Sequence, residues 1–211
     1  MHPPLGKWLI GVGIRLFGFD SFGWRISSAV AGTLSVALLY LLARRLFRST
    51  LAATVASGLL AFDLLHFVQS RTSMLDIFVP LFGIAGFYFL LLDRDRLLTS
   101  GSSPGKLDRP WRLAAGASFG AAVATKWSGG LLLLAGLALT IVWELAARRE
   151  RPVGERIRSF LRSEALSVAV FLVLVPVLVY TLSYAGRVGG SWTAAPWKEG
   201  SVARNLWNHH D

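Results

Sequence analysis

Three cationic side chains are candidates for chemistry: Arg71 and Lys126 in the short polar segments that separate long uncharged runs, and Lys7 in the opening helix. Charge is costly near hydrocarbon, so such side chains usually face a cavity or a partner. Arginine can bind phosphate oxygens through two parallel hydrogen bonds, and lysine acts as a point charge. Such cations would suit a site for the phosphate of a lipid. The alternative is structural, with Arg71 paired to Asp76 and Lys126 reaching toward lipid headgroups.

Histidines close to carboxylates give two weaker candidates for chemistry. Asp63 and His66 lie three residues apart, on one face of a helix, where they could form a proton relay or a metal pair. A helix-packing hydrogen bond is the commoner role of such a pair. His209, His210 and Asp211 are adjacent, but neighbouring histidines point in different directions and no other ligands cluster there. We therefore expect no metal site, and the absence of cysteine excludes disulfides and thiolate sites.

The composition indicates a membrane protein. The 211 residues are 54% hydrophobic and 16% charged, whereas soluble domains carry about a quarter charged residues. The deficit is concentrated in uncharged runs close to the length that crosses a bilayer. A formal net charge of +10 would suit a nucleic-acid partner. The basic residues stand in short blocks between apolar runs, however, as in the loops of membrane proteins, so nucleic-acid binding is not expected.

Six segments have the apolarity of membrane spans, which predicts an all-α, polytopic helix bundle. The weakest, Leu113–Thr125, is short and rich in Ala and Gly. Within it, Gly116 and Gly120 form a GxxxG pattern, which permits close helix packing and accounts for the low hydropathy. The other five are Ile26–Ala43, Leu51–Val68, Ile77–Leu92, Trp127–Ala147 and Ala165–Tyr184.

The basic residues divide unequally between the two sides of this bundle. The segments Arg44–Arg48, Asp93–Arg112 and Arg148–Arg162 together hold 14 of the 22. Cytoplasmic loops carry the excess of Lys and Arg in membrane proteins, so we place these three segments in the cytoplasm. The three candidate cations and Asp76 then share the outer face.

One membrane domain in three parts is expected over residues 1–211. Residues 1–24 form an amphipathic segment at the outer face, residues 25–184 form the transmembrane bundle, and residues 185–211 begin an outer loop. On the cytoplasmic side, Arg151–Ser163 alternates Arg with apolar residues. This segment is either a basic amphipathic helix on the anionic leaflet or a solvated basic loop.

Three motifs, in order along the chain, resemble those of protein O-mannosyltransferases. They are His2-Pro3-Pro4-Leu5-Gly6-Lys7-Trp8-Leu9-Ile10, Gln69-Ser70-Arg71-Thr72-Ser73-Met74-Leu75-Asp76 and Ala124-Thr125-Lys126-Trp127-Ser128-Gly129. With the spans between them, the resemblance covers essentially the whole chain. Lipid-linked aminoarabinose transferases also carry a Pro-Pro-Leu motif near this point, usually with Lys before the prolines. His2 and the Thr-Lys-Trp motif therefore favour the mannosyltransferases.

The resemblance implies a GT-C glycosyltransferase fold and transfer of mannose from a polyprenyl- or dolichyl-phosphate carrier to Ser or Thr of secreted proteins. In such enzymes the lipid phosphate is the leaving group, so nearby positive charge stabilises the transition state. Arg71 is the first choice for this role and Lys126 the second. Lys7 and His2 are expected to position the carrier or shape the site, and Asp76 is expected to orient Arg71.

The resemblance also implies that the catalytic base is not in this sequence. The family's base belongs to an Asp-Glu pair just before the His-Pro-Pro motif, where a hydroxyl nucleophile needs a proton acceptor. The sequence begins at that motif, so we expect a fragment that carries no catalytic residue and is inactive alone. No cofactor is expected, because the sugar donor is itself a substrate, and the sequence is silent on a divalent ion.

The implied partners are a polyprenyl-phosphate sugar donor, a secreted protein acceptor and membrane lipids. The implied location is the bacterial plasma membrane, with the active face outside the cytoplasm. Two alternatives stay open. One is a non-catalytic lipid-binding membrane subunit or transporter segment, and the other is a lipid-linked sugar transferase of different specificity.

Overall fold

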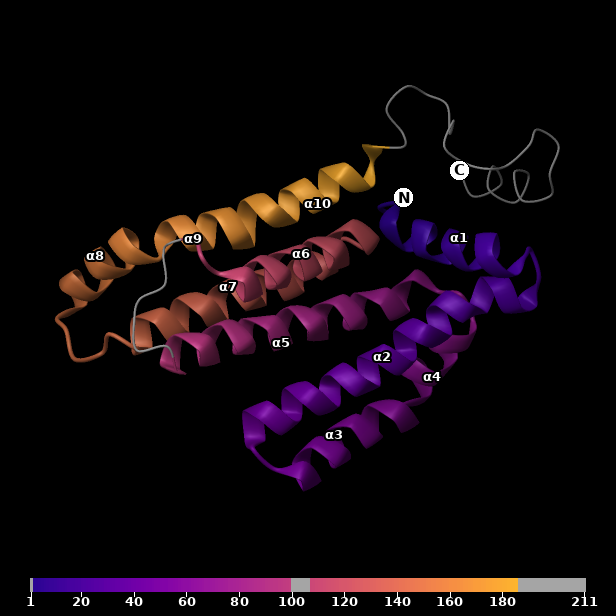
Figure 1. Ribbon diagram of the computed structural model, residues 1–211, viewed down its shortest axis with the longest axis horizontal. Helices are drawn as coiled ribbons and strands as arrows, with labels where there is room; N and C mark the ends of the chain where they lie inside the picture. Colours follow the sequence, from indigo (N-terminus) through magenta and orange to yellow (C-terminus); the bar gives the residue numbers. More distant parts are fainter. Residues whose placement is uncertain (1, 100–106, 186–211) are drawn as a thin grey trace.

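The computed structural model describes residues 2–99 and 107–185, and every regular element within these residues is a helix. The helices form an elongated bundle that runs back and forth between two ends (Figure 1). We call these the α1 end, where α1 (Leu5–Phe17) lies, and the α8 end, where α8 (Val153–Ser163) lies. The predicted all-α fold is confirmed.

The other elements follow in chain order. Before the first gap they are α2 (Ser21–Phe47), α3 (Thr50–Phe62), α4 (Leu64–Arg71), the 3-10 helix η1 (Leu75–Ile77) and α5 (Phe78–Thr99). After it they are α6 (Pro110–Thr125), α7 (Gly129–Ala146), α9 (Ala165–Ala169), the π-helical turn η2 (Val170–Leu174) and α10 (Val175–Ser183).

Four helical stretches in the described residues are long and apolar enough to cross a membrane. They are α2, η1 with α5, α7, and the continuous run from α9 to α10. The pair α3 and α4 passes the same test only when taken together, and its two helices meet at an angle of 59°. α6 corresponds to the weakest predicted span and has 16 residues. The predicted count of six spans is therefore approximate.

The predicted span Leu51–Val68 is not one straight helix, because the chain breaks at Asp63. The backbone of Asp63 is extended, with φ −64° and ψ 123°. Its carboxylate accepts a hydrogen bond from the backbone N–H of His66 at 2.7 Å, which is how aspartate caps the start of a helix. A single polar residue inside an apolar run thus ends α3 and starts α4.

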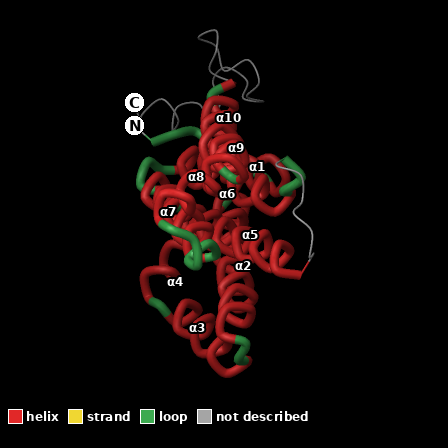
Figure 2. The backbone as a smooth tube through the Cα atoms, turned by 90° about the vertical axis from the view of Figure 1, so that its left-hand side faces the viewer, coloured by secondary structure: helices red, strands yellow, loops and turns green. Residues whose placement is uncertain are grey.

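α6 lies at the centre of the bundle, with α5, α7 and α10 around it in the view from the α8 end (Figure 2). Ala115, Phe119 and Ala122 on this helix are fully buried. A Cβ atom on Gly116 would overlap the backbone oxygen of Phe171 in η2, and one on Gly120 would lie 2.7 Å from the Cα of Pro176. The GxxxG pattern therefore does allow the close helix packing that the sequence predicts.

The outside of the bundle is apolar. Leu51, Leu59 and Phe62 on α3 are 76%, 71% and 92% exposed, respectively. A soluble protein rarely leaves contiguous apolar surface of this kind open to water. The same helices that would lie in a bilayer thus present side chains suited to lipid.

The turns between helices fall where the charge bias predicts. α2, α5 and α7 end at the α8 end, whereas α4 ends and α5 and α7 begin at the α1 end (Figure 1). The segment Arg151–Ser163 forms helix α8 for most of its length, and none of the residues of α8 is buried. The helical form of this segment is therefore confirmed. The predicted outer loop, residues 185–211, lies outside the described residues except for its first residue.

Candidate lipid-phosphate site

The three motif segments meet at the α1 end of the bundle. Gly6, on the first turn of α1, packs between the segment that leads into α5 and the last residue of α6. A Cβ atom on Gly6 would lie 2.7 Å from Leu75 Cδ2 and 2.9 Å from Thr125 Cγ2. Thr125 is fully buried. Only glycine leaves room for α1 to approach both neighbours this closely, so one small residue brings the first motif against the other two.

A salt bridge joins the second and third motifs. Lys126 follows α6 with an extended backbone, φ −152° and ψ 140°. Its ammonium group donates a hydrogen bond to Asp76 Oδ1 at 2.5 Å. The side chains of Lys126 and Asp76 are 32% and 40% exposed, so solvent reaches both. An ammonium group has three N–H donors, and this salt bridge occupies one of them.

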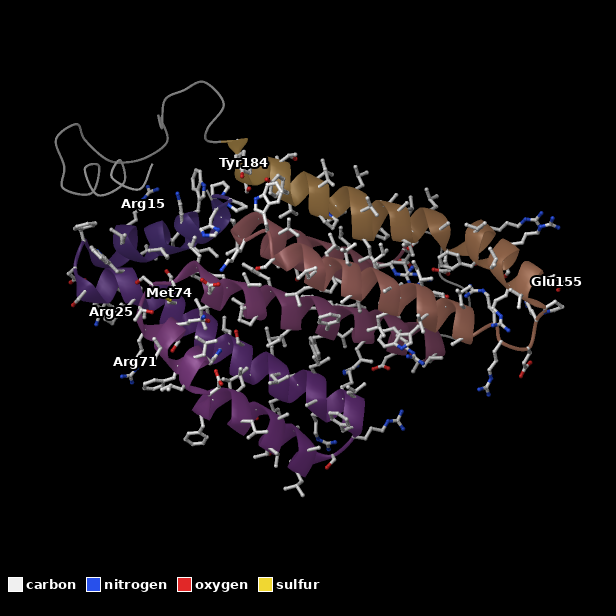
Figure 3. All side chains as sticks on the ribbon, turned by 180° about the vertical axis from the view of Figure 1, so that it is seen from behind. Arg15, Arg25, Arg71, Met74, Glu155 and Tyr184 are labelled. Carbon is white, nitrogen blue, oxygen red and sulfur yellow. The ribbon has the colours of Figure 1, made fainter. Side chains whose placement is uncertain are left out.

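Asp76 does not orient Arg71, so that expectation is wrong. Arg71 ends α4 and is exposed, and its guanidinium lies over the ring of Phe67 at 4.2 Å. Within the described residues it forms no ion pair. Figure 3 shows its side chain at the α1 end, beyond the helices.

The turn between α4 and η1 explains why the two residues separate. Ser73 adopts the left-handed conformation, φ 55°. Its hydroxyl donates a hydrogen bond to the backbone oxygen of Trp24 in α2 at 2.6 Å. The turn is thus fixed against α2, and η1 directs Asp76 toward Lys126 rather than back toward α4.

The two weaker site residues lie near this junction. Lys7 is half-buried and directly follows Gly6 on α1. His2 is exposed and precedes Pro3 and Pro4, which are both buried. The structure therefore places Lys7 next to the meeting point of the motifs and leaves His2 at its edge.

Asp63 and His66 take part in packing. Asp63 caps α4 through the backbone of His66, as described above, and the ring Nε2 of His66 lies 3.2 Å from the backbone oxygen of Gly32 in α2. In the described ranges, no group of three or more His, Asp or Glu residues is arranged to hold a metal ion. His209, His210 and Asp211 lie outside those ranges.

A second ionic cluster, at the α8 end, was not predicted from the sequence. Arg112, 2% exposed, donates to Asp93 at 3.0 Å, to Glu164 at 2.9 Å and to Glu144 at 3.2 Å. Arg109, 3% exposed, donates to Asp93 at 3.0 Å and to Glu164 at 2.7 Å. The available signal was the position of these residues, because each acid borders an uncharged run. The cluster ties together the ends of α5, α6, α7 and α9.

Known proteins resemble this chain in sequence over most of its length. Residues 1–186 match the model of the dolichyl-phosphate-mannose-protein mannosyltransferase family. A polyprenol-phosphate-mannose–protein mannosyltransferase of Mycolicibacterium smegmatis is 39% identical over 198 residues, covering 88% of this chain and 38% of the relative. The protein of the same name in Corynebacterium glutamicum is 35% identical, covering 87% of this chain and 38% of the relative.

A shorter match relates the chain to a different transferase. The undecaprenyl phosphate-alpha-4-amino-4-deoxy-L-arabinose arabinosyl transferase of Pseudomonas aeruginosa is 56% identical over 46 residues, which is 22% of this chain and 8% of the relative. The chain spans 38% of the length of the mannosyltransferases that it matches. Its apolar helices and these relatives identify an integral membrane protein. The chain belongs to the dolichyl-phosphate-mannose-protein mannosyltransferase family.

Proposed function

We propose that this chain is part of an enzyme that transfers mannose from a polyprenyl-phosphate carrier to Ser or Thr hydroxyls of secreted proteins. The reaction takes place at the outer face of the bacterial plasma membrane, where the α1 end lies. The names of the relatives support the donor and the protein acceptor. The observation that carries the proposal is the convergence of three motifs at one end, joined by the Lys126–Asp76 salt bridge.

The proposed chemistry places positive charge at the leaving group. The acceptor hydroxyl attacks the anomeric carbon, the bond from that carbon to the phosphate oxygen breaks, and the lipid phosphate departs with the electron pair. Cations near the phosphate stabilise the charge that develops on it. Lys126 has two N–H donors beyond the one that Asp76 accepts, so it can hold Asp76 and contact the phosphate at once.

Arg71 suits the same role through a different geometry. Its guanidinium stacks on the Phe67 ring, which occupies a face of the group. The N–H donors point outward in the plane of the guanidinium, so stacking leaves them available for two parallel hydrogen bonds to phosphate. Lys7 adds a third cation beside Gly6, and His2 shapes the edge of the site.

Asp76 is assigned a positioning role. Its carboxylate is held by the ammonium of Lys126. The base that takes the hydroxyl proton is assigned to the Asp-Glu pair that the family resemblance places before the His-Pro-Pro motif. The proposal includes no cofactor, because the phosphate ester of the donor already provides the leaving group.

The test is an assay of the full-length protein with polyprenyl-phosphate-mannose and a Ser/Thr peptide. Arg71→Ala and Lys126→Ala should each lower the transfer rate by about 10²–10³-fold, the usual cost of removing a group that stabilises transition-state charge. Arg25→Ala is the matched control, since Arg25 is an exposed cation at the same end. Equal activity in all three folded variants would refute the role of the two cations.

The match to the arabinosyl transferase favours one alternative, a lipid-linked transferase with a different sugar. The shared chemistry is the polyprenyl-phosphate leaving group, so the cation variants do not separate the two functions. Offering polyprenyl-phosphate-mannose and polyprenyl-phosphate-aminoarabinose in competition does. Preferential consumption of the mannose donor supports the main proposal, and preference for the other donor replaces it.

A further inference from the structure

A cavity of about 710 Å³ opens at the α8 end, far along the bundle from the candidate site. It lies between the last turns of α5 and α7, the first turn of α6 and the start of α9. Its apolar lining includes Leu90, Leu97 and Leu98 of α5. Its polar lining includes Trp143 and four arginines, which are Arg94, Arg112, Arg148 and Arg149. The cavity therefore offers one ligand both hydrocarbon contacts and cationic groups.

The depth of the cavity matches the boundary between hydrocarbon and headgroups. The uncharged run of α5 stops at Asp93, that of α7 stops at Glu144, and that of α9 starts after Glu164. All three acids line the cavity. Trp143 is of the residue type that is enriched at the membrane–water interface. Leu90, one turn before Asp93, marks the hydrocarbon side.

The acids that line the cavity are already neutralised by arginine. Asp93 and Glu164 each accept hydrogen bonds from Arg109 and Arg112. Glu144 accepts one from Arg112 at 3.2 Å and one from Arg148 at 2.7 Å. Three carboxylates thus balance three guanidinium groups, and this part of the wall is electrically neutral.

Two further arginines in the wall have no such counter-charge. Arg94 lies over the ring of Trp143 at 4.4 Å, and Arg149 is exposed at the end of α7. Among the residues that the structure describes, neither is paired with a carboxylate. The cavity therefore carries a surplus of two positive charges at the level of the headgroups.

The inner wall also holds an unused acceptor. Asp93 is 2% exposed, and its Oδ1 has no hydrogen-bond donor among the described residues. A buried carboxylate oxygen usually has a donor. A hydroxyl group or a water molecule in the cavity could supply it, and a headgroup with hydroxyls, such as glycerol, brings that donor with it.

We propose that this cavity binds the headgroup of an anionic phospholipid, with its phosphate between Arg94 and Arg149 and its acyl chains leaving past Leu90, on the hydrocarbon side of Asp93. Arginine recognises phosphate oxygens through its fork of N–H donors. The leaflet at the α8 end is the cytoplasmic one by the charge bias, and cytoplasmic leaflets carry anionic lipids. The site is separate from the proposed donor site and takes a lipid that is not consumed.

The test uses the full-length protein, purified in detergent and supplied with phosphatidylglycerol or phosphatidylcholine. Native mass spectrometry measures the lipid that each sample retains. The wild-type protein should retain phosphatidylglycerol at least fivefold more than phosphatidylcholine. Arg94→Gln with Arg149→Gln should lose most of this preference. Arg44→Gln with Arg48→Gln is the matched control, because it removes two exposed cations at the same end of the bundle, on α2 and its C-cap, and should keep the preference.

Three results would overturn the proposal. An equal loss of the phosphatidylglycerol preference in the two double variants would mean that the preference arises from general surface charge. Equal retention of both lipids by the wild-type protein would remove the anionic specificity. Displacement of the lipid by excess inorganic phosphate would assign the cavity to a soluble anion. If the Arg94/Arg149 variant fails to fold, the thermal stability of the wild-type protein decides instead, and phosphatidylglycerol should raise it more than phosphatidylcholine.

Discussion

Lys126 has two tasks in the proposed site, because it holds Asp76 and is proposed to bind the lipid phosphate. The 2.5 Å contact between Lys126 and Asp76 joins two segments that are 50 residues apart in the sequence. Both side chains remain partly exposed. The pair is therefore better suited to positioning a charge than to stabilising the fold, since exposed ion pairs contribute little to stability.

Asp76→Asn tests in the full-length enzyme whether Asp76 positions the charge of Lys126. It keeps the shape of the side chain but removes the charge that holds Lys126, so we expect mannose transfer to fall by about tenfold. Loss of a general base would cost about 10²–10⁴-fold and would change the pH profile of the rate. A drop larger than that of Lys126→Ala, with an altered pH profile, would make Asp76 the base instead.

Arg112 is the residue on which the buried cluster at the α8 end depends. It contacts three carboxylates and is 2% exposed. Arg112→Ala would leave those acids buried with fewer partners, so we expect a loss of about 3–5 kcal/mol in the free energy of unfolding. The comparison is Arg45→Ala, which removes an exposed salt bridge to Asp95 with side chains 40% and 39% exposed. That change should cost at most about 1 kcal/mol.

Thermal melting in detergent measures both variants. A similar melting temperature for Arg112→Ala and Arg45→Ala would contradict the importance of burial at this cluster. Arg112→Lys should recover only part of the loss, because an ammonium group cannot reproduce the planar fork of donors.

Single residues show where prediction from sequence stops. The alternation of apolar and polar segments predicted that Lys7, Arg71 and Lys126 lie on one face of the membrane. The partner of Asp76 did not, because Arg71 is nearest along the chain, whereas the left-handed turn at Ser73 directs Asp76 to Lys126. The cluster around Arg112 was missed for the same reason, since its acids come from α5, from α7 and from the junction between α8 and α9.

Among the helices, α6 shows how a short segment becomes the core. Hydropathy alone made Leu113–Thr125 the weakest span, but its glycines predicted close packing, and Gly116 does lie against the backbone of η2. The break at Asp63 was harder to predict. One acid in an apolar run changes the mean hydropathy little, although it changes the backbone course completely through its capping hydrogen bond.

Gly116→Ala and Gly58→Ala form a matched pair of helical substitutions. Alanine is favoured over glycine inside a helix by about 0.5–1 kcal/mol. At Gly58 a Cβ atom meets nothing within 4 Å, so this variant should be neutral or more stable. At Gly116 the Cβ atom would overlap a backbone oxygen, and overpacking of this kind costs about 1–3 kcal/mol.

The melting temperatures of the two variants provide the measurement. We expect Gly116→Ala to melt below the wild-type protein and Gly58→Ala to melt at or above it. If Gly116→Ala were as stable as Gly58→Ala, α6 and η2 would have room to separate, and α6 would not be the tightly packed centre of the bundle.

For the whole molecule, the two ends differ in their chemistry. The α1 end holds the candidate phosphate site with few charges, whereas the α8 end holds the buried ionic cluster and most of the basic loop segments. The distribution of basic residues predicted this division, because assigning a loop to one side of the membrane requires only the order of spans and loops along the chain. It could not predict the cavity, whose walls come from four elements and from contacts between them.

The orientation of the molecule can be tested directly, because the 211 residues contain no cysteine. Both Arg25, near the start of α2, and Glu150, between α7 and α8, are exposed. Single cysteines at these two positions provide reporters for the two ends of the bundle in a full-length protein whose other cysteines are replaced by serine. A maleimide that cannot cross membranes should label Arg25→Cys in intact cells. It should label Glu150→Cys only after the membrane is permeabilised, because the positive-inside bias places the basic loops in the cytoplasm. The reverse pattern would put the candidate phosphate site on the cytoplasmic side and would exclude secreted proteins as its acceptors. Labelling of both positions in intact cells would mean that the segments between them do not cross the membrane an odd number of times, which would contradict the alternation of helices in the bundle.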